Sequence, residues 1–381
     1  MKVTISVHGR YHAFELAKGL HQRHLLDQLL TTYPGFMAQK VVGRDAQIRS
    51  APLLEVRRRL YSRFRIGSKP DLRIAKSFAA FARKNIREGT DIFTGWSAAS
   101  LEAIETARAY GCKIIIERGS THIAAQTDVL REAYQEFGLA FTETDSEMIA
   151  REEQEYELAD KISVPSRYAA QTFVEQGFSA DKLIINGLGV DLERFQAPQA
   201  RPTDRTPRVL FVGGVGIRKG VPRLLQAFKH LLSKAELHLI GPVSPDFESY
   251  LQKHTGDNIF VRGTVAGSDL ASEYGRADIF CLPSLEEGYG MVIPQAMACG
   301  LPIVTTHVVG AADLLAHGHN GLIVAPSDSR ALADALERLI DDVPLRQSMG
   351  AKALKTVQAG KSWDDYLERT VKSYEALLMR R

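Results

Sequence analysis

The sequence predicts an α/β protein with two domains, each built on a parallel β-sheet. Short apolar segments rich in β-branched residues alternate with longer helix-like segments, and this alternation occurs twice along the chain. Such alternation is typical of parallel sheets that helices cover on both faces. A chain of 381 residues is also too long for one ordinary core, so two domains are expected.

The expected elements follow one another in a regular order. In the first half, the alternation predicts strands over 3–7, 91–94, 113–117, 161–165 and 182–185, with helices over 13–20 and 97–110. In the second half, it predicts strands over 208–212, 236–240, 259–261, 279–282, 302–305 and 321–324, with helices over 221–232, 268–274, 293–299 and 329–339. Ligands bind beyond the carboxyl ends of strands in open α/β sheets, so the loops after strands are the expected binding sites.

A linker separates the two halves. Residues 196–207 form a polar run with three prolines and no apolar period. We therefore place the domain junction there, with a first Rossmann-like domain over 1–198 and a second over 205–361. The two domains are expected to face each other across a cleft.

The composition argues against several classes of protein. The net charge of +3 does not point to a nucleic-acid partner. The chain has no run of 18 or more apolar residues, as a membrane-spanning helix needs, and its first residues read as a strand rather than as a signal peptide. The three cysteines lack metal-type spacing, which favours a reducing, cytoplasmic setting and buried, unpaired thiols.

A glycine-rich basic loop follows the first strand of the second half. Residues 213–220 contain Gly214 and Gly216, then Arg218 and Lys219, and lead directly into a helix. Glycines let the backbone approach a ligand, and a helix N-terminus offers free N–H groups and a partial positive charge. With two added cations, this loop has the chemistry needed to hold a diphosphate.

Known nucleotide-binding motifs fit this loop less well. The glycine spacing misses the dinucleotide-binding fingerprint by one residue, and the next strand does not end in the acidic residue that would hold a ribose. A Walker phosphate-binding loop is absent as well. A solvated basic turn without a ligand remains an alternative.

The richest segment runs from 282 to 302, after a second apolar strand. Gly288 and Gly290 flank Tyr289 just before a helix, and successive N–H groups at such a turn can form an anion-binding concavity. Glu287 precedes this turn and suits sugar hydroxyls, which are hydrogen-bond donors. Gln295, two helical turns later, can also bind hydroxyls.

This segment resembles the signature of the retaining family-four glycosyltransferases of the GT-B fold, which reads P-S-x-x-E-G-F/Y-G-x-x-x-x-E-A-M-A-C-G-x-P. The resemblance implies that Glu287 contacts the donor sugar and that the turn 288–290 approaches the sugar and phosphates. Where the family has a second glutamate for the nucleotide ribose, this chain has Gln295.

The basic loop resembles the same family. Lys219 and Gly220 match its lysine–glycine pair, which implies that Lys219 holds the diphosphate. Many members carry an arginine where this chain has Gly214, so our hypothesis is that Arg218 supplies that charge.

Weaker matches extend over the rest of the chain. Residues 186–191 with Phe195 resemble the family's domain junction, and 362–364 open a last helix (362–381) that in relatives crosses back onto the N-terminal domain. Residues 117–122 resemble a loop that points a histidine into the cleft. This match implies that His122 contacts the sugar in the transition state, with an ordinary loop histidine as the alternative.

The first strand ends in a polar loop that contains Gly9, Arg10 and His12. Loops at this position are typical sites, so Arg10 and His12 could meet an acceptor or the donor phosphates. The resemblance implies that the loop faces the acceptor. A helix-capping turn with solvated side chains is the alternative.

Residues 57–87 form a basic segment, with eleven Arg or Lys and one acid, Asp71. Interleaved apolar residues give it the composition of a surface that lies on anionic lipid. Relatives act on lipid-linked acceptors at the cytoplasmic leaflet, which implies a cytoplasmic protein that is peripheral to the inner face of the membrane. A solvated basic face on ordinary helices explains the composition equally well.

The resemblance implies transfer of a sugar from a nucleotide diphosphate to a hydroxyl with retention of configuration, in polysaccharide, glycolipid or glycoconjugate synthesis. No cofactor is expected, because the donor is a substrate, basic groups neutralise the leaving diphosphate, and the sequence shows no well-placed Asp-x-Asp metal motif. A degenerate relative that binds a nucleotide sugar without transfer is one alternative, since Gly214 and Gln295 depart from the family pattern. A nicotinamide oxidoreductase is another, disfavoured by the glycine spacing.

Overall fold

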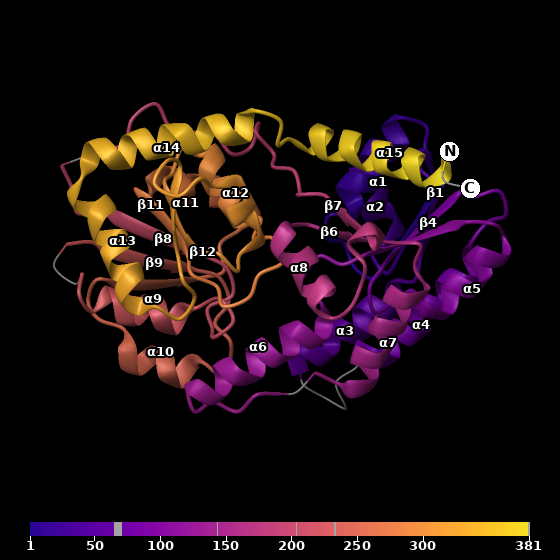
Figure 1. Ribbon diagram of the computed structural model, residues 1–381, viewed down its shortest axis with the longest axis horizontal. Helices are drawn as coiled ribbons and strands as arrows, with labels where there is room; N and C mark the ends of the chain where they lie inside the picture. The colour runs from indigo at the N-terminus through magenta and orange to yellow at the C-terminus, as the bar shows by residue number, and fades with distance from the viewer. Residues whose placement is uncertain (65–70, 143, 203, 232–233, 380–381) are drawn as a thin grey trace.

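The computed structural model describes residues 1–64, 71–142, 144–202, 204–231 and 234–379. Within these residues, two parallel sheets form the centres of two lobes that lie side by side, as Figure 1 shows. The sequence prediction of two parallel-sheet domains is therefore confirmed.

The N-terminal sheet has seven strands in the described chain, in the order β3-β2-β1-β4-β5-β6-β7, and its neighbouring strands pair in parallel. The strands are β1 (Val3–Val7), β2 (Leu26–Thr31), β3 (Ile48–Ser50), β4 (Ile92–Trp96), β5 (Lys113–Glu117), β6 (Lys161–Val164) and β7 (Leu183–Ile185). The helices of this half are α1 (Ala13–Gln22), α2 (Gly35–Val42), α3 (Pro52–Phe64), α4 (Asp71–Asn85), α5 (Leu101–Ala109), α6 (Ile123–Glu136), α7 (Ser146–Leu158), α8 (Arg167–Glu175) and the 3-10 turn η1 (Ala180–Lys182).

The C-terminal sheet has six described strands in the order β10-β9-β8-β11-β12-β13, again paired in parallel. They are β8 (Arg208–Val212), β9 (Glu236–Ile240), β10 (Ile259–Gly263), β11 (Ile279–Leu282), β12 (Ile303–Thr306) and β13 (Gly321–Val324). The helices are α9 (Val221–Phe228), α10 (Glu248–His254), η2 (Gly267–Asp269), α11 (Leu270–Arg276), α12 (Val292–Ala298), η3 (Gly310–Leu314), α13 (Ser329–Asp341), α14 (Val343–Gln358) and α15 (Trp363–Met379).

Both sheets reverse their winding direction at one position. The chain moves outward from β1 to β2 and β3, and then resumes on the other side of β1 at β4; β8 and β11 repeat this arrangement in the second sheet. Ligands bind at such switch points in open α/β sheets. The loops after β1, β4, β8 and β11 are therefore the ones that the fold makes available for a site.

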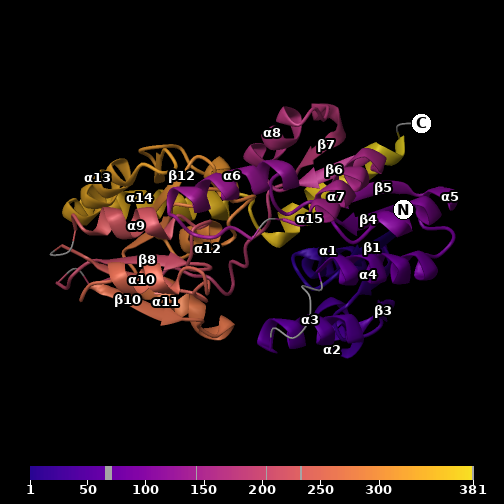
Figure 2. The same cartoon turned by 90° about the horizontal axis from the view of Figure 1, so that it is seen from below.

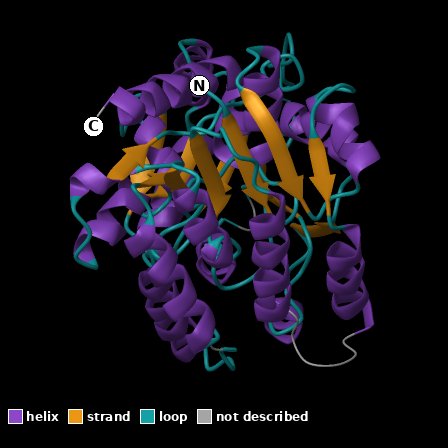
Figure 3. Ribbon diagram, turned by 90° about the vertical axis from the view of Figure 1, so that its right-hand side faces the viewer, coloured by secondary structure: helices purple, strands orange, loops and turns teal. Residues whose placement is uncertain are grey.

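The strands were identifiable because both faces of each sheet are covered. All five residues of β1 are buried, including the two polar ones, and the last four residues of β8 are buried as well. Figure 3 shows helices on both sides of the N-terminal strands. Continuous apolar runs are the expected pattern for parallel strands in this setting. Cys112, Cys281 and Cys299 are buried free thiols, as predicted.

Two strands were missed by the sequence analysis, namely β2 and β3. Strand β2 carries Asp27 and Gln28, which find partners only in the folded protein: Asp27 accepts a hydrogen bond from Thr90 (3.0 Å), and Gln28 donates to the carbonyl of Asn85 (2.8 Å). Strand β3 has only three residues and lies at the sheet edge. Strands this short or this polar lack the apolar period on which the prediction relied.

The C-terminal helix α15 returns to the N-terminal lobe, as expected, and Figure 1 shows it beside α1 after α14 has run along the other lobe. Its Tyr374 hydroxyl accepts a hydrogen bond from Thr94 of β4 (3.1 Å). The segment that enters α15 lies parallel to the segment around Val190, which leaves the N-terminal lobe. The Val190 N–H donates to the carbonyl of Lys361 (2.9 Å), and Val190 forms a parallel bridge with Ser362. Two adjacent segments thus connect the lobes.

The basic segment over 57–87 forms most of α3 and all of α4, and its residues 65–70 lie outside the described part of the chain. On α4, the apolar residues Ile74 and Phe78 face the core rather than solvent. The expectation that the whole segment exposes an amphipathic face is therefore wrong for α4. On α3, Leu53, Val56 and Leu60 are exposed. Over the described residues, no helix is both long and apolar enough to span a bilayer.

We predict that Gly189→Ala weakens the connection between the lobes. A Cβ at this position would lie 2.6 Å from the Trp363 Cα, so one of the two connecting segments must move. Overpacking of this kind costs about 1–3 kcal/mol. Thermal unfolding measures the effect, with Gly275→Ala in α11 as the matched control, because nothing lies within 4 Å of a Cβ there. Equal melting temperatures for the two variants would contradict the prediction.

Candidate functional site

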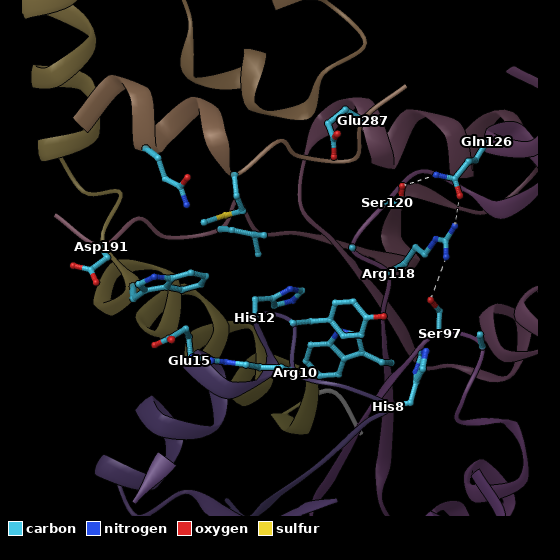
Figure 4. A pocket seen from close by; sticks show the side chains of 18 of the residues that line it. His8, Arg10, His12, Glu15, Ser97, Arg118, Ser120, Gln126, Asp191 and Glu287 are labelled. Carbon is cyan, nitrogen blue, oxygen red and sulfur yellow. Dashed lines mark hydrogen bonds between the residues drawn. The ribbon is translucent and has the colours of Figure 1, made fainter. Parts of the chain in front are cut away.

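A cavity of about 760 Å³ lies between the two lobes. Much of its wall comes from the strand ends identified above: residues 8 and 10–12 after β1, 96–98 at the end of β4, 118–120 after β5, Arg218 after β8 and Glu287 after β11. Gln295 of α12 and Trp363 of α15 also line the cavity, as do residues from the segment between the lobes and the start of α12, namely Leu188, Asp191, Arg194, Phe195 and Met291. Figure 4 shows polar side chains from both lobes directed into this space.

The glycine-rich loop is pressed against the loop that follows β11. Gly220 has a φ of +68°, and a Cβ there would lie 2.7 Å from the carbonyl carbon of Pro283. Gly216 is packed against Ser244, whose Oγ would be 2.8 Å from an added Cβ, whereas no atom lies within 4 Å of one at Gly214. Only glycine fits at 220, so this residue brings the preceding cations to the end of β11.

Lys219 and Glu287 form an ion pair; Glu287 lines the cavity, whereas Lys219 is not one of its lining residues. The two side chains come from loops on either side of the switch point and are 21% and 12% exposed. Burial, together with the neighbouring positive charge of Arg218, lowers the pKa of Lys219 to about 7. The two residues that the sequence assigned to diphosphate and sugar binding are thus in direct contact.

Glu286 is a residue that the sequence analysis did not single out, and its side chain is fully buried. One carboxylate oxygen accepts hydrogen bonds from Ser120 (3.0 Å) and Thr121 (2.6 Å), and the other from Gln126 (2.9 Å) and Arg218 (2.8 Å). Burial alone would raise its pKa, but Arg218 and the hydrogen bonds outweigh burial and lower the pKa to about 2. Glu286 is adjacent in sequence to the predicted Glu287, but Glu286 is buried between the lobes whereas Glu287 lines the cavity.

Arg218 lines the cavity, as expected for a donor-binding group, but it also has partners within the protein. Its Nε donates to Glu286 and its Nη2 to Ser120 (3.3 Å). The side chain is 38% exposed. Arg218 therefore joins the two lobes while part of it remains accessible from the cavity.

The turn after Glu287 contacts the N-terminal lobe. The Gly288 carbonyl accepts a hydrogen bond from Ser166 (2.7 Å), and the hydroxyl of the buried Tyr289 donates to the carbonyl of Leu188 (2.9 Å). Gly290 has a φ of +85° and lies against Glu287. Tyr289 thus supports the turn from behind, and its side chain is not part of the cavity wall.

Gln295, the position of the family's second glutamate, does line the cavity. Its carbonyl oxygen accepts a hydrogen bond from the buried Tyr274 hydroxyl (3.1 Å). This bond fixes the direction of the amide, so that its NH₂ group is the end available to a ligand.

On the N-terminal side, Arg10 and His12 line the cavity and Gly9 shapes their loop with a φ of +111°. Figure 4 shows Arg10, His12 and Glu15 close together. The His12 Nε2 lies 3.5 Å from Glu117, and its ring packs beside Trp96. Neighbouring His8 also faces the cavity, and burial, followed by the charge of Arg58, lowers its pKa to about 4.

His122 does not lie where the resemblance placed it. Its side chain is 1% exposed, its ring packs against Tyr156, Phe173 and Phe178, and it is absent from the cavity wall. Its Nδ1 accepts the N–H of Ala124 (3.3 Å), which caps α6. Burial, with Arg118 as the second cause, lowers the pKa of His122 to about 4. The expectation that His122 points into the cleft is therefore wrong.

Arg118 occupies the cavity wall instead, four residues earlier on the same loop. Its guanidinium forms an ion pair with Glu152 (2.8 Å) and donates to the Thr121 carbonyl (2.9 Å) and to Gln126 (3.1 Å). These partners hold the charged end of a nearly buried arginine at the cavity. The sequence does place Arg118 directly after a strand, a position typical of binding sites, but the resemblance in this loop pointed to His122 instead.

Among the described residues, no three His, Cys, Asp or Glu side chains come together in a way that could hold a metal ion.

The geometry agrees with what comparisons with known proteins find. The sequence profile of the family described as glycosyl transferases group 1 matches residues 206–342, which contain both the glycine-rich loop and Glu287. Most of the C-terminal lobe is thus similar to this family.

The chain also has curated relatives. One is the capsular polysaccharide biosynthesis glycosyltransferase CapM of Staphylococcus aureus, 32% identical over 184 residues, which are 45% of this chain and 48% of CapM. The matches to the first curated relatives span about half of their length, from 45% to 60%.

Solved structures cover nearly the whole chain. Sucrose-phosphate synthase from Thermosynechococcus elongatus superposes with a TM-score of 0.73 at 21% identity, over 100% of this chain and 99% of the other. Anabaena HepE in complex with UDP gives a TM-score of 0.72 at 14% identity, over 99% and 100%. At these identities the likeness concerns the fold alone, and the fold is GT-B, as expected.

We predict that His122→Ala destabilises the protein without a selective loss of ligand binding. Removing the ring leaves a cavity between three aromatic side chains, which costs about 2–4 kcal/mol. Because the folded-state pKa of His122 lies below its unfolded value of about 6.5, its contribution to stability is full above that pH and falls toward pH 4. Thermal unfolding at pH 8 and pH 5 measures both effects. A folded variant with normal stability and impaired sugar-nucleotide binding would return His122 to the site.

Proposed function

We propose that this protein is a retaining glycosyltransferase that moves a sugar from a nucleotide diphosphate to a hydroxyl group of an acceptor. The observation that carries the proposal is the contact of Lys219 with Glu287, which lines the cavity. One group suits a diphosphate and the other suits sugar hydroxyls, and these are the two parts of a sugar nucleotide that adjoin the bond to be broken.

The leaving diphosphate gains negative charge as the glycosidic bond breaks. Lys219, the accessible part of Arg218 and the N-terminus of α9 all lie at the end of β8, where this charge would develop. Groups that are already aimed at a developing charge stabilise the transition state without further reorganisation. In this proposal no metal ion or cofactor takes part, and the departing phosphate accepts the acceptor proton.

In this proposal, donor binding replaces the ion pair between Lys219 and Glu287 with contacts to the donor. The diphosphate takes Lys219 and the sugar hydroxyls take Glu287, so each group keeps a charge-assisted hydrogen bond. Because both side chains are partly buried, leaving either one without a partner would carry a desolvation cost. The exchange therefore favours a ligand that supplies both an anion and hydroxyl groups.

The opposite wall is assigned to the acceptor. Arg10, His12 and Arg118 come from the first lobe and face the donor groups across the cavity, as Figure 4 shows for the first lobe and Glu287. HepE in complex with UDP and CapM in capsular polysaccharide biosynthesis support a nucleotide-sugar donor and a sugar or lipid-linked sugar acceptor.

A membrane surface is proposed on α2 and α3. Exposed apolar side chains on these two helices accompany Arg57 and Arg58; they are Phe36, Met37, Leu53, Val56 and Leu60. Apolar residues with adjacent cations suit anionic lipid. In this proposal the protein acts from the cytoplasm at the inner face of the membrane.

The function is tested by ligand binding and turnover, with Glu287→Gln as the matched variant. A thermal-shift screen of UDP-, GDP- and ADP-sugars should raise the melting temperature for the true donor, since a ligand of the folded state stabilises it. The wild type should then transfer or hydrolyse that donor, and NMR of the product should show retention. In Glu287→Gln, kcat/KM should fall by about 10²-fold or more.

Glu287→Gln also tests recognition of the diphosphate separately from recognition of the sugar. Free nucleoside diphosphate should bind Glu287→Gln at least as tightly as the wild type, because Lys219 no longer has a carboxylate partner. Binding of the donor without any turnover by the wild type would favour the degenerate sugar-nucleotide-binding protein. Gln295 is the feature that favours this alternative, since a neutral amide stands where the family has a carboxylate. Absence of binding by all sugar nucleotides would refute both.

We predict that donor affinity falls as the pH rises through neutrality. The pKa of Lys219 is lowered to about 7, so its positive charge is present below that pH and is lost above it. The donor dissociation constant should then rise by at most about tenfold per pH unit above pH 7. Calorimetric titration between pH 6 and 9 measures it, and Lys219→Arg is the control, because arginine stays protonated throughout. Identical slopes for the two proteins would show that Lys219 is not the titrating group.

A further inference from the structure

A single buried carboxylate lies at the centre of the contact between the lobes. Glu286 uses both oxygens and has four hydrogen-bond donors around it. Ser120, Thr121 and Gln126 belong to the turn after β5 and the first turns of α6, whereas Arg218 belongs to the glycine-rich loop after β8. The carboxylate therefore joins a loop of the acceptor side to a loop of the donor side.

The bonds continue into the first lobe beyond Glu286. The Gln126 NH₂ group donates to Glu286 and Ser120, while its carbonyl accepts from Arg118 (3.1 Å), so both ends of the amide are fixed. Arg118 in turn lies 3.4 Å from the Ser97 hydroxyl after β4. Figure 4 shows this chain of bonds from Ser97 to Ser120 along one wall of the cavity.

The backbones around Glu286 are also in close contact. A Cβ at Gly288 would lie 2.7 Å from the Gly119 carbonyl oxygen, so only glycine allows the two loops to meet. The Ser166 hydroxyl holds the Gly288 carbonyl on the other side (2.7 Å). A change in the direction of the 119–126 turn would thus move the wall against which Glu287 is placed.

We propose that Glu286 is a positioning residue, whose carboxylate holds Arg218 and the 119–126 turn in register and so aligns the donor and acceptor halves of the cavity. The part that concerns alignment for transfer rests on the proposed function. The clasp between the lobes, meaning Glu286 with its four donors, is independent of that function.

Helix α6 explains what the loss of this clasp would do. The far end of α6 is attached to the second lobe as well: Glu136 forms an ion pair with Arg223, and Arg223 lies over the Phe137 ring at 4.9 Å. Figures 1 and 2 show α6 reaching from the first lobe to α9 and α10. Without Glu286 the lobes would remain attached at this end, and the turn at the near end would be released.

The chemistry of the site favours a carboxylate over an amide. A glutamine at 286 would lack the negative charge that pairs with Arg218, and its NH₂ group would meet either the Gln126 and Arg218 donors or two hydroxyls that would have to turn and accept. Glu286→Gln is therefore expected to break the clasp while it changes the side-chain volume little. Asp278→Asn is the matched control, because Asp278 is also buried and accepts from Arg205 (2.8 Å), but within the second lobe.

The test measures the clasp and the reaction separately in the full chain. Hydrogen–deuterium exchange should become at least tenfold faster over 119–126 in Glu286→Gln and stay unchanged there in Asp278→Asn. With the donor found above, kcat should fall by 10- to 100-fold in Glu286→Gln at saturating donor, and Asp278→Asn should keep its kcat even where its melting temperature drops. Gln126→Ala, which removes one of the four donors, should move both readings in the same direction by less, and serves if Glu286→Gln does not fold.

The outcomes separate the two claims. Unchanged exchange over 119–126 in a folded Glu286→Gln would overturn the clasp. Faster exchange with an unchanged kcat would keep the clasp and overturn the positioning role. If the wild type transfers no sugar at all, the proposed function and the positioning role both fail, while the exchange data still decide whether Glu286 holds the lobes together.

Discussion

Two adjacent carboxylates at the end of β11 meet two adjacent cations at the end of β8, and the arrangement of the whole site depends on this meeting. Glu286 pairs with Arg218 and Glu287 pairs with Lys219. Buried charges are tolerated only when they are paired and hydrogen-bonded. The two loops must therefore lie against each other, and Gly220 permits it because no Cβ stands between its backbone and Pro283. The helices and strands behind these loops supply the rigid support.

The two pairs have different environments and therefore different roles. Glu286 is fully buried with four donors, and its low pKa shows that the protein itself stabilises its charge. Glu287 lines the cavity and pairs with Lys219, and burial beside Arg218 lowers the pKa of Lys219, so its charge is less strongly stabilised than that of Glu286. A charge that the protein stabilises fully is suited to hold parts together, whereas a weakly stabilised one can accept a ligand of opposite charge. The division between clasp and binding pair follows from burial, although the residues are neighbours in sequence.

The sequence predicted the parts of this arrangement that depend on local patterns. The strands that end at the cavity are short apolar runs, and the glycine-rich loop and Glu287 carry recognisable spacing. Glu286 was missed because its donors come from residues about 70 to 170 positions away, which no local pattern reveals. His122 was misplaced for a related reason: a histidine after a strand can turn inward as well as outward, and the ring contacts with Phe173 and Phe178 decide the direction. Strand β2 was missed because tertiary partners satisfy its polar residues.

The replacement of a family glutamate by Gln295 can be understood from its partner in this chain. A glutamate would accept hydrogen bonds from ribose hydroxyls, whereas the Tyr274 hydroxyl already uses one acceptor position of the Gln295 carbonyl and orients the amide. The amide therefore presents a donor to the cavity, and a ribose hydroxyl would have to act as acceptor toward it. The change reverses the polarity of one hydrogen bond and removes one negative charge from a cavity that also contains Glu287. Removing that charge lowers the repulsion that a diphosphate meets, so the departure at 295 is compatible with a donor held mainly by Lys219 and Arg218.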